Sequence, residues 1–266
     1  MKHKLTYQHI RSILPGIVAI LVALPVFAAA AANDPISVSV SADAWIRSDN
    51  KNQSSANASN AVGQISEGGN ARALLRFDFS EISLPENATF ASVSLVIIRA
   101  NVDSSSESAT VTFNVHELTT SFNESATWNK SNASDDWTTA GGGGDYDSIV
   151  LASADLGTKT AIYTPDSFSG DGLNSIVKNA LENGSVLNLL IKTADEDTFT
   201  NRHLIWFKSM TDSNSNLTSS ANATLLIEYT MIPEPATTAA LFAGVAILAA
   251  IGILRRRRRH RHRHHR

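Results

Sequence analysis

The sequence predicts an all-β protein, a jelly-roll-like antiparallel β-sandwich with one short helix, flanked by a signal peptide and a C-terminal transmembrane helix. Three observations support this prediction. Short runs rich in β-branched and aromatic residues recur through the middle of the chain. Spacers rich in Asn, Ser, Asp and Gly separate these runs, as turns require. Long apolar runs occur only near the two ends.

The first 32 residues carry the features of a secretory signal peptide. Lys2, Lys4 and Arg11 form a basic start, and an apolar run from Ile13 to Phe27 follows. Ala28 to Ala32 supplies the small residues at which such peptides are cleaved. An uncleaved anchor is the alternative, but the run is short for a bilayer-spanning helix. We therefore expect residues 1–32 to direct export and then to be removed.

The middle of the chain, residues 33–231, is expected to form one β-sandwich. Its strand-forming runs are short, and several alternate between apolar and polar residues, as half-buried strands do. The expected strands are Ile36–Arg47, Ala73–Phe79, Thr89–Ala100, Thr110–Leu118, Ser148–Ala152, Thr160–Tyr163, Val186–Thr193, His203–Lys208 and Thr224–Thr230. Eight or nine short strands in about 200 residues are typical of a two-sheet sandwich of the jelly-roll kind.

One segment of this middle region has a helical period instead. Apolar residues fall at i, i+3, i+4, i+7 and i+8 between Leu173 and Leu181. Asp171 is a suitable N-cap, and Gly184 is a suitable C-terminal stop. We expect the apolar side of this helix to pack on the sandwich.

The distribution of charge excludes some classes of function. Residues 33–232 hold 24 Asp and Glu against 11 Lys and Arg, a net charge of −13. Phosphate contacts need the opposite sign, so no nucleic acid is expected as a partner. The chain has no cysteine, which excludes disulfides, thiolate metal sites and a cysteine nucleophile.

The C-terminal segment, residues 232–266, reads as a membrane-directed signal. Pro233, Glu234 and Pro235 precede an uncharged run of nineteen residues, 236–254. At 1.5 Å rise per residue this run nearly matches the ~30 Å hydrocarbon core of a bilayer. The Arg- and His-rich tail 255–266 follows at once, and such basic flanks stay in the cytoplasm. The membrane is therefore an expected partner.

This order of features resembles the PEP-CTERM sorting signal of Gram-negative bacteria. The matching residues are Pro233, Glu234, Pro235, the span 236–254 and the Arg cluster that begins with Arg255, Arg256 and Arg257. The resemblance implies recognition by an exosortase-type processing protease. It also implies transfer from the inner membrane to the cell surface or extracellular matrix, often in bacteria that make exopolysaccharide. An ordinary single-span anchor is the alternative.

The middle domain resembles the DNRLRE family in the order of its segments. These are Asp43–Arg47, Arg72–Asp78, Ser125–Asn129, the helix Leu173–Glu182 with the strand Val186–Lys192, Ile205–Ser209 and Leu225–Tyr229. The resemblance implies a β-sandwich of secreted and surface proteins, some of whose relatives bind carbohydrates, including alginate. This chain has Lys208, Ser209, Met210 and Thr211 where the family tends to have a Ser-Arg-Glu element.

No catalytic constellation stands out, so we do not expect an enzyme. His116 and Glu117 begin like a zinc protease motif, but Thr120 stands where the second ligand belongs. The nucleophile-elbow pattern G-x-S-x-G is absent. Paired carboxylates could hydrolyse glycosides, but nothing in the sequence singles out one pair.

Calcium is the one cofactor that the sequence suggests. Asp212, Asn214 and Asn216 resemble the first half of an EF-hand loop, and such oxygen atoms suit calcium. Leu217 and Ala223 replace the glycine and glutamate that complete that motif. A solvated acidic loop is the alternative.

Sugar binding needs exposed aromatic faces beside polar groups. Trp137 lies in a polar loop with Tyr146 nearby, and it is the best candidate for an exposed platform; anchoring of that loop over the core is the alternative. Arg47, Arg72 and Arg76 could grip an acidic sugar, since arginine binds carboxylates through two donors. For Arg76 the alternative is an ion pair, for example with Asp78.

Together these patterns predict an exported, sorted surface protein whose sandwich binds extracellular polysaccharide or matrix. A structural envelope or biofilm protein without a defined sugar ligand is one alternative. A polysaccharide-active enzyme is the other, and it would need two carboxyl groups facing each other across a cleft.

Overall fold

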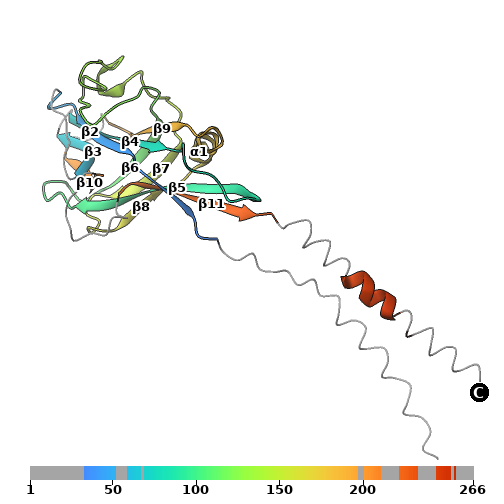
Figure 1. Cartoon of the computed structure of the whole chain (residues 1–266). Coiled ribbons are helices and arrows are strands. Elements are labelled where there is room, and N and C mark those ends of the chain that lie inside the picture. The colour runs from blue at the N-terminus through green and yellow to red at the C-terminus, as the bar shows by residue number, and fades with distance from the viewer. Residues whose placement is uncertain are drawn as a thin grey trace, which may run out of the picture. The chain divides into compact units, whose positions relative to one another are not determined.

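The computed structural model describes residues 33–51, 59–66, 69–196, 201–210, 222–232, 244–252 and 255. Within these residues the domain contains eleven strands, one α-helix and one short 3-10 turn at Ala140–Gly142 (Figure 1). The strands are β1 (Ile36–Ser39), β2 (Ala42–Arg47), β3 (Ser59–Ser66), β4 (Gly69–Asp78), β5 (Ala88–Asn101), β6 (Thr110–Glu117), β7 (Ala152–Gly157), β8 (Pro165–Phe168), β9 (Val186–Thr193), β10 (His203–Lys208) and β11 (Thr224–Met231). The all-β prediction is therefore confirmed. The expected signal peptide, residues 1–32, lies outside the described residues.

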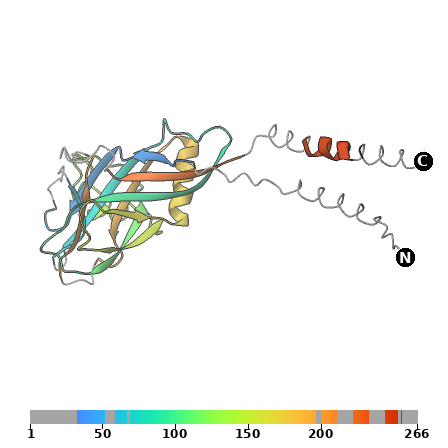
Figure 2. The same cartoon turned by 90° about the horizontal axis from the view of Figure 1, so that it is seen from below.

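The strands belong to one continuous antiparallel sheet that folds into two layers (Figure 2). One layer has the order β1-β11-β5-β8, and the other has β2-β4-β9-β6-β7. Strands β3 and β10 connect the layers, since β10 pairs with the end of β5 and with β3, and β3 pairs with the start of β4. All of these pairings are antiparallel.

The main hydrophobic core draws on both layers. In β5 every second residue from Val93 to Ile97 is buried, and the residues between them are only partly covered. Strands β4 and β9 differ, because residues on both of their faces are buried. The inward face of β4 enters the main core, and its outward face is covered by the segment 118–151. This second covered face carries several of the candidate binding residues.

The helix α1 (Asp171–Asn183) confirms the helical prediction. Leu173, Val177 and Leu181 are buried along one side of it and join the main core. Gly184 caps its C-terminus in the left-handed conformation, and its backbone N–H donates to Ala180 O. The N-cap is Gly170, one residue before the expected Asp171, which lies in the first turn instead.

Two strands, β3 and β8, were not predicted from the sequence. Strand β3 contains Ser, Asn and Gly, which are typical of a spacer, so it was not predicted as a strand. Gly63 is required in this strand because its φ of +128° is a conformation that other residues rarely adopt. A Cβ at Gly63 would lie 2.0 Å from the backbone oxygen of His203 on β10. Strand β8 begins with a proline, and a proline at the start of a strand is compatible with pairing to a single neighbour.

Three predicted strands have different bounds in the structure. The run Ile36–Arg47 is divided into β1 and β2, which lie in different layers. The run Ser148–Ala152 is mostly loop, and β7 begins at its last residue. Residues Thr160–Tyr163 form a turn rather than a strand, and Tyr163 has a φ of +63° that is incompatible with extended backbone.

The described chain enters and leaves the domain on neighbouring strands. Ile36 in β1 pairs with Ile227 in the antiparallel β11. Beyond β11, the backbone N–H of Ile232 donates to Asn87 O, just before β5 begins. Both connections therefore emerge at the same end of this layer.

Candidate functional site

The outward face of β2, β4 and β9 is covered by the segment 118–151. Four apolar side chains of the sheet form the floor of this contact: Ala44, Ile46, Leu74 and Leu190. The covering residues are Leu118, Phe122, Ala126, Trp128, Trp137 and, at the margin, Tyr146. The strand positions on either side of Leu74 are Arg72 and Arg76, so one arginine flanks each side of the covered patch.

Trp137 is a loop anchor and does not form an exposed platform. Its exposed fraction is 5%, and its indole Nε1 donates to Thr127 O at 2.8 Å. The expectation of an exposed ring is therefore wrong. The polar neighbours Asp135 and Asp136 suggested exposure in the sequence, but the ring turns inward because the sheet offers it an apolar floor.

Arg72 is occupied by contacts within the protein. Its Nε and Nη2 donate to the two carboxylate oxygens of Glu196 at 2.7 and 2.5 Å, and its Nη1 donates to Gly141 O at 2.5 Å. The guanidinium also lies 5.0 Å from the ring centroid of Trp128 and 5.9 Å from that of Tyr146. Arg72 therefore holds the covering segment in place, and Tyr146 is part of the same packing.

Arg47 lies elsewhere and is also paired. It donates to both carboxylate oxygens of Asp49 and stacks over Trp45 at 5.2 Å. The hydrogen bond from Arg47 lowers the pKa of Asp49, and the same bond raises the pKa of Arg47. Arg47 and Arg76 sit at opposite ends of the β2–β4 pairing, about 16 Å apart at ~3.3 Å per residue. The sequence-predicted ligand residues therefore do not share one surface.

Arg76 borders an open groove with an approximate volume of 470 Å³. Its Nε donates to Asn188 Oδ1 at 3.1 Å, its Nη2 donates to Phe122 O, and its guanidinium lies 5.0 Å from the Phe122 ring centroid. Asp78, the partner suggested by the sequence, instead accepts a hydrogen bond from the backbone N–H of Ser80. The lining residues are Arg76, Ser121, Phe122, Asn123, Asn132, Val186 and Asn188.

This groove has unused hydrogen-bond donors and no carboxylate in its lining. Among the described residues no acceptor contacts Arg76 Nη1, Asn188 Nδ2 or Asn123 Nδ2. The carbonyl oxygens of these two asparagines accept bonds within the protein, from Arg76 and from Ser125. An arrangement with one guanidinium and spare amide donors suits a ligand rich in acceptors, and above all a carboxylate.

Of the residues that line this groove, the sequence predicted only Arg76 as a ligand contact. Asn188 carried a usable signal, since it is a polar residue within the otherwise apolar start of the strand Val186–Thr193. Ser121, Phe122 and Asn123 carried no such signal. They reach the groove because the segment 118–151 folds back over β4, which is a tertiary contact.

His116 is buried on the same face of the sheet, beside the covering segment. Its Nδ1 lies 3.0 Å from Asp147 O and 3.1 Å from Ile149 O, and its ring meets Tyr146 edge-on at 5.0 Å. Nε2 has no partner in the described part of the chain. Burial lowers the pKa of His116, and the positive charges of Lys192 and Arg72 lower it further.

Acidification is therefore expected to weaken the fold through His116. The unfolded chain takes up this proton near the ordinary histidine pKa of 6.5, whereas the folded protein resists it. The contribution of His116 should lower the free energy of unfolding by up to about 1 kcal/mol as the pH drops from 7.5 to 5.5. Urea denaturation at both pH values measures this, with His116→Asn as the comparison because asparagine retains a donor near the Nδ1 position. An equal fall in both proteins would assign the pH dependence to other groups.

Metal binding has no support from the described residues. Within them, no group of three or more His, Cys, Asp or Glu side chains is placed to hold a metal ion. The calcium candidates Asp212, Asn214 and Asn216 lie outside the described residues.

The sorting signal also falls largely outside the described part. Pro233, Glu234, Pro235, Arg256 and Arg257 are not described, whereas residues 244–252 and Arg255 are helical. In the ranges that the structure describes, no helix is both long enough and apolar enough to cross a membrane.

Comparison with protein-family models and with curated protein sequences identifies no relative. The resemblances to the PEP-CTERM signal and the DNRLRE domain therefore rest on the residues of this sequence alone.

Proposed function

We propose that this chain is an exported, exosortase-sorted surface protein of a Gram-negative bacterium, whose domain is a jelly-roll-like β-sandwich that binds extracellular polysaccharide. The Arg76 groove carries this proposal. It combines a half-buried guanidinium with spare amide donors on the outward face of a sheet, and its lining has no carboxylate that would repel an acidic sugar.

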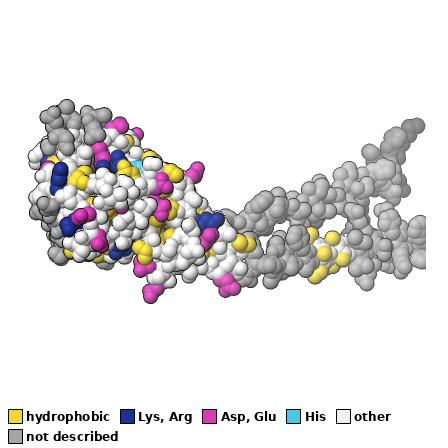
Figure 3. Space-filling view, turned by 90° about the horizontal axis from the view of Figure 1, so that it is seen from above, with side chains coloured by type: hydrophobic (Ala, Val, Ile, Leu, Met, Phe, Trp, Pro, Cys, Tyr) yellow, Lys and Arg dark blue, Asp and Glu magenta, His cyan; other side chains and the backbone are white. Residues whose placement is uncertain are grey.

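Because the whole domain carries a negative charge, binding of an acidic sugar depends on local contacts in this groove. The domain is acidic overall, and Asp and Glu side chains are scattered over the face shown in Figure 3, with Lys and Arg between them rather than in one basic patch. An anionic polymer is repelled at long range by such a surface, although salt screens this beyond about 8–10 Å. Short-range contacts at Arg76 must then supply the affinity.

The tail supports the membrane part of the proposal. Residues 244–252 form a helix without a charged residue, and Val245, Ile247, Leu248 and Ile251 are exposed on it. Contiguous exposed apolar side chains need a covering partner, and a bilayer provides one. The connection to this tail leaves the domain beside its N-terminal entry, so one end of the sandwich carries both attachments.

The binding test is a pull-down of the full-length chain, in detergent, on alginate and on neutral dextran. We expect retention on alginate, with a dissociation constant raised about tenfold by Arg76→Gln, because a charge-assisted hydrogen bond contributes roughly 1.5–3 kcal/mol. Arg47→Gln is the matched control, since that arginine is paired with Asp49 away from the groove. Repeating the assay with calcium and with a chelator tests the proposed cofactor.

Substitutions at Val186 distinguish a loss of ligand contact from a loss of stability in the loop that lines the groove. Val186 is exposed at the groove, so its substitution should leave the fold intact. Val186→Glu should weaken alginate binding, and Val186→Lys should strengthen it. Equal binding by these two variants, or equal retention on alginate and dextran, would contradict recognition of an acidic sugar in this groove.

A structural envelope or biofilm protein is the second candidate function. The observation that favours it is the burial of Trp137 and Phe122, which leaves the groove without an exposed aromatic face. Catalysis is less well supported, because neither the Arg76 groove nor the pocket beside α1 is lined by two carboxyl groups. Failure to bind any polysaccharide would favour the structural role.

A further inference from the structure

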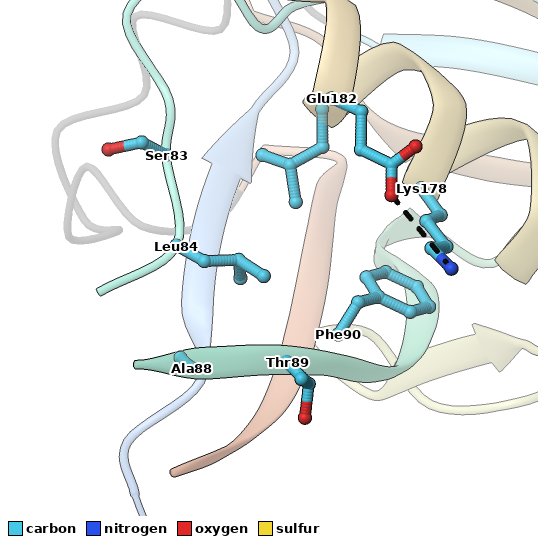
Figure 4. A pocket seen from close by; sticks show the side chains of 8 residues that line it. Ser83, Leu84, Ala88, Thr89, Phe90, Lys178 and Glu182 are labelled. Atoms are coloured by element: carbon cyan, nitrogen blue, oxygen red, sulfur yellow. Dashed lines mark ion pairs between the residues drawn. The ribbon is translucent and has the colours of Figure 1, made fainter. Parts of the chain in front are cut away.

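A second pocket lies at the end of the domain from which the chain leaves β11. It has an approximate volume of 370 Å³ and lies between helix α1 and the segment that leads into β5. Figure 4 shows Leu84 and Phe90 beside this space, with the ion pair of Lys178 and Glu182 at its helical side. Leu84 and Phe90 are only partly buried, so their apolar surface is open to the exterior.

The last residues of β11 extend this apolar surface. Phe90 pairs with Tyr229, and Ala88 pairs with Met231, so these four side chains share one face of the β5–β11 ribbon. Met231 and the following Ile232 are 47% and 52% exposed. Ile232 lies just beyond β11 at the same end of the domain. We call the apolar residues at this end, Leu84, Phe90, Met231 and Ile232, the tether face.

The ribbon remains folded to its last residue. The hydroxyls of Thr89 and Thr230 are 2.8 Å apart, and the backbone N–H of Ile232 donates to Asn87 O at 2.6 Å. The fold therefore holds the chain in place up to the residue before Pro233. Only Pro233, Glu234 and Pro235 separate it from the proposed span 236–254.

The length of this connection limits how far the domain can stand from a membrane. From Ile232 to Ala236 an extended chain reaches at most about 14 Å, at ~3.5 Å per residue. The polar layer on each side of the hydrocarbon core is itself roughly 5–8 Å thick. Ile232 must then lie within several ångströms of the headgroups whenever 236–254 spans the bilayer.

We propose that the tether face rests on the lipid surface of the membrane in the anchored precursor. This inference relies on the proposed function for the span 236–254, but not on sugar binding. The short connection holds the face at an effective concentration in the millimolar range, so a weak apolar contact is sufficient. Lys178 offers a cation to a lipid phosphate, whereas Glu81, Glu86 and Glu182 oppose an anionic surface.

The absence of cysteine makes this proposal directly testable with single-cysteine labels in the full-length chain. Ser83→Cys places a fluorophore in the pocket, and Ser104→Cys places one beyond the other end of β5. The fourteen residues of β5 span about 45 Å when fully extended. Ala246→Cys reports whether the span inserts. The chain is reconstituted in phosphatidylcholine vesicles that carry a lipid-attached quencher.

We expect strong quenching at Ala246→Cys, at least twofold more quenching at Ser83→Cys than at Ser104→Cys, and weaker quenching at Ser83→Cys as phosphatidylglycerol is added. Quenching at Ser83→Cys no greater than at Ser104→Cys would overturn the proposal. An unquenched label at Ala246→Cys would overturn both this proposal and the proposed membrane span. Retention of the same preparation on alginate would then show that sugar binding does not depend on the span. If Ser83→Cys were protected only in native membranes and not in lipid vesicles, the tether face would bind a protein partner, and the proposal of lipid contact would be overturned.

A pair of substitutions tests whether the exposed apolar residues make the contact. Met231→Ser with Ile232→Ser should reduce quenching at Ser83→Cys to the level at Ser104→Cys, without changing the melting temperature of the domain. Ile149→Ser with Val150→Ser is the matched control, because both residues are exposed and lie outside the tether face. Unchanged quenching in the first pair would overturn the role of the tether face.

Discussion

Replacing Asp166 by asparagine is expected to lower the free energy of unfolding by about 3–5 kcal/mol. Asp166 on β8 accepts a hydrogen bond from Nε of Arg99 on β5, and the exposed fractions of the two side chains are 10% and 1%. The substitution leaves the buried guanidinium without its counter-charge. Nη2 of Arg99 already lacks a hydrogen-bond partner among the described residues, so the guanidinium depends strongly on its pairing with Asp166.

Urea denaturation followed by circular dichroism measures this effect. The control is Glu182→Gln, which breaks the ion pair of Lys178 and Glu182 on the exposed side of α1. Exposed pairs contribute only about 0–1 kcal/mol, so the control should unfold almost as the unaltered protein does. Equal destabilisation by the two substitutions would contradict the importance of the buried pair.

Trp137→Ala is expected to have an effect of similar size, about 3–5 kcal/mol, because it removes a large side chain from a packed interior. The cavity would open between the segment 118–151 and the outward face of the sheet, next to Trp128 and Leu190. The lost hydrogen bond to Thr127 O adds to this cost. Thermal and urea unfolding should both show the loss.

The exposed residue Ile149, in the same covering segment, provides the control. Ile149→Ala removes little buried surface and should change stability by no more than about 0.5 kcal/mol. A Trp137→Ala variant as stable as Ile149→Ala would mean that the segment does not pack on the sheet as described.

The Trp137 result also affects how sugar binding is tested. Phe122 and Asn123 of the Arg76 groove belong to the segment that Trp137 anchors. A Trp137→Ala variant that loses polysaccharide binding would therefore show only that the segment had moved. Substitutions at Val186, which is exposed at the groove, test ligand contact more directly.

Local patterns predicted the secondary structure well where one face of an element is buried. The alternation in β5 and the helical period of Leu173 to Leu181 follow from the side-chain geometry of single elements. Strand β3 was missed because its role depends on a close approach of Gly63 to β10. Strand β8 was missed because its pairing with β5 compensates for a weak local preference.

The candidate site was predicted less well, for a physical reason. The sequence identified the arginines and tryptophans, whose chemistry suits sugars, but the use of each group depends on its partners. Glu196 lies 124 residues from Arg72 and occupies two of its donors. Asn188 and the Phe122 carbonyl accept from Nε and Nη2 of Arg76, and Nη1 has no acceptor among the described residues.

The sequence by itself determined the all-β class, the position of the helix, the acidic charge of the domain and the order of the apolar and basic segments at its ends. These properties depend on composition and on the periodicity of neighbouring residues. Only the tertiary structure decided that Trp137 is buried, that Arg47 and Arg72 are paired, and that Arg76 borders a groove. Burial and pairing depend on contacts between residues far apart in the chain, and local periodicity carries no information about them.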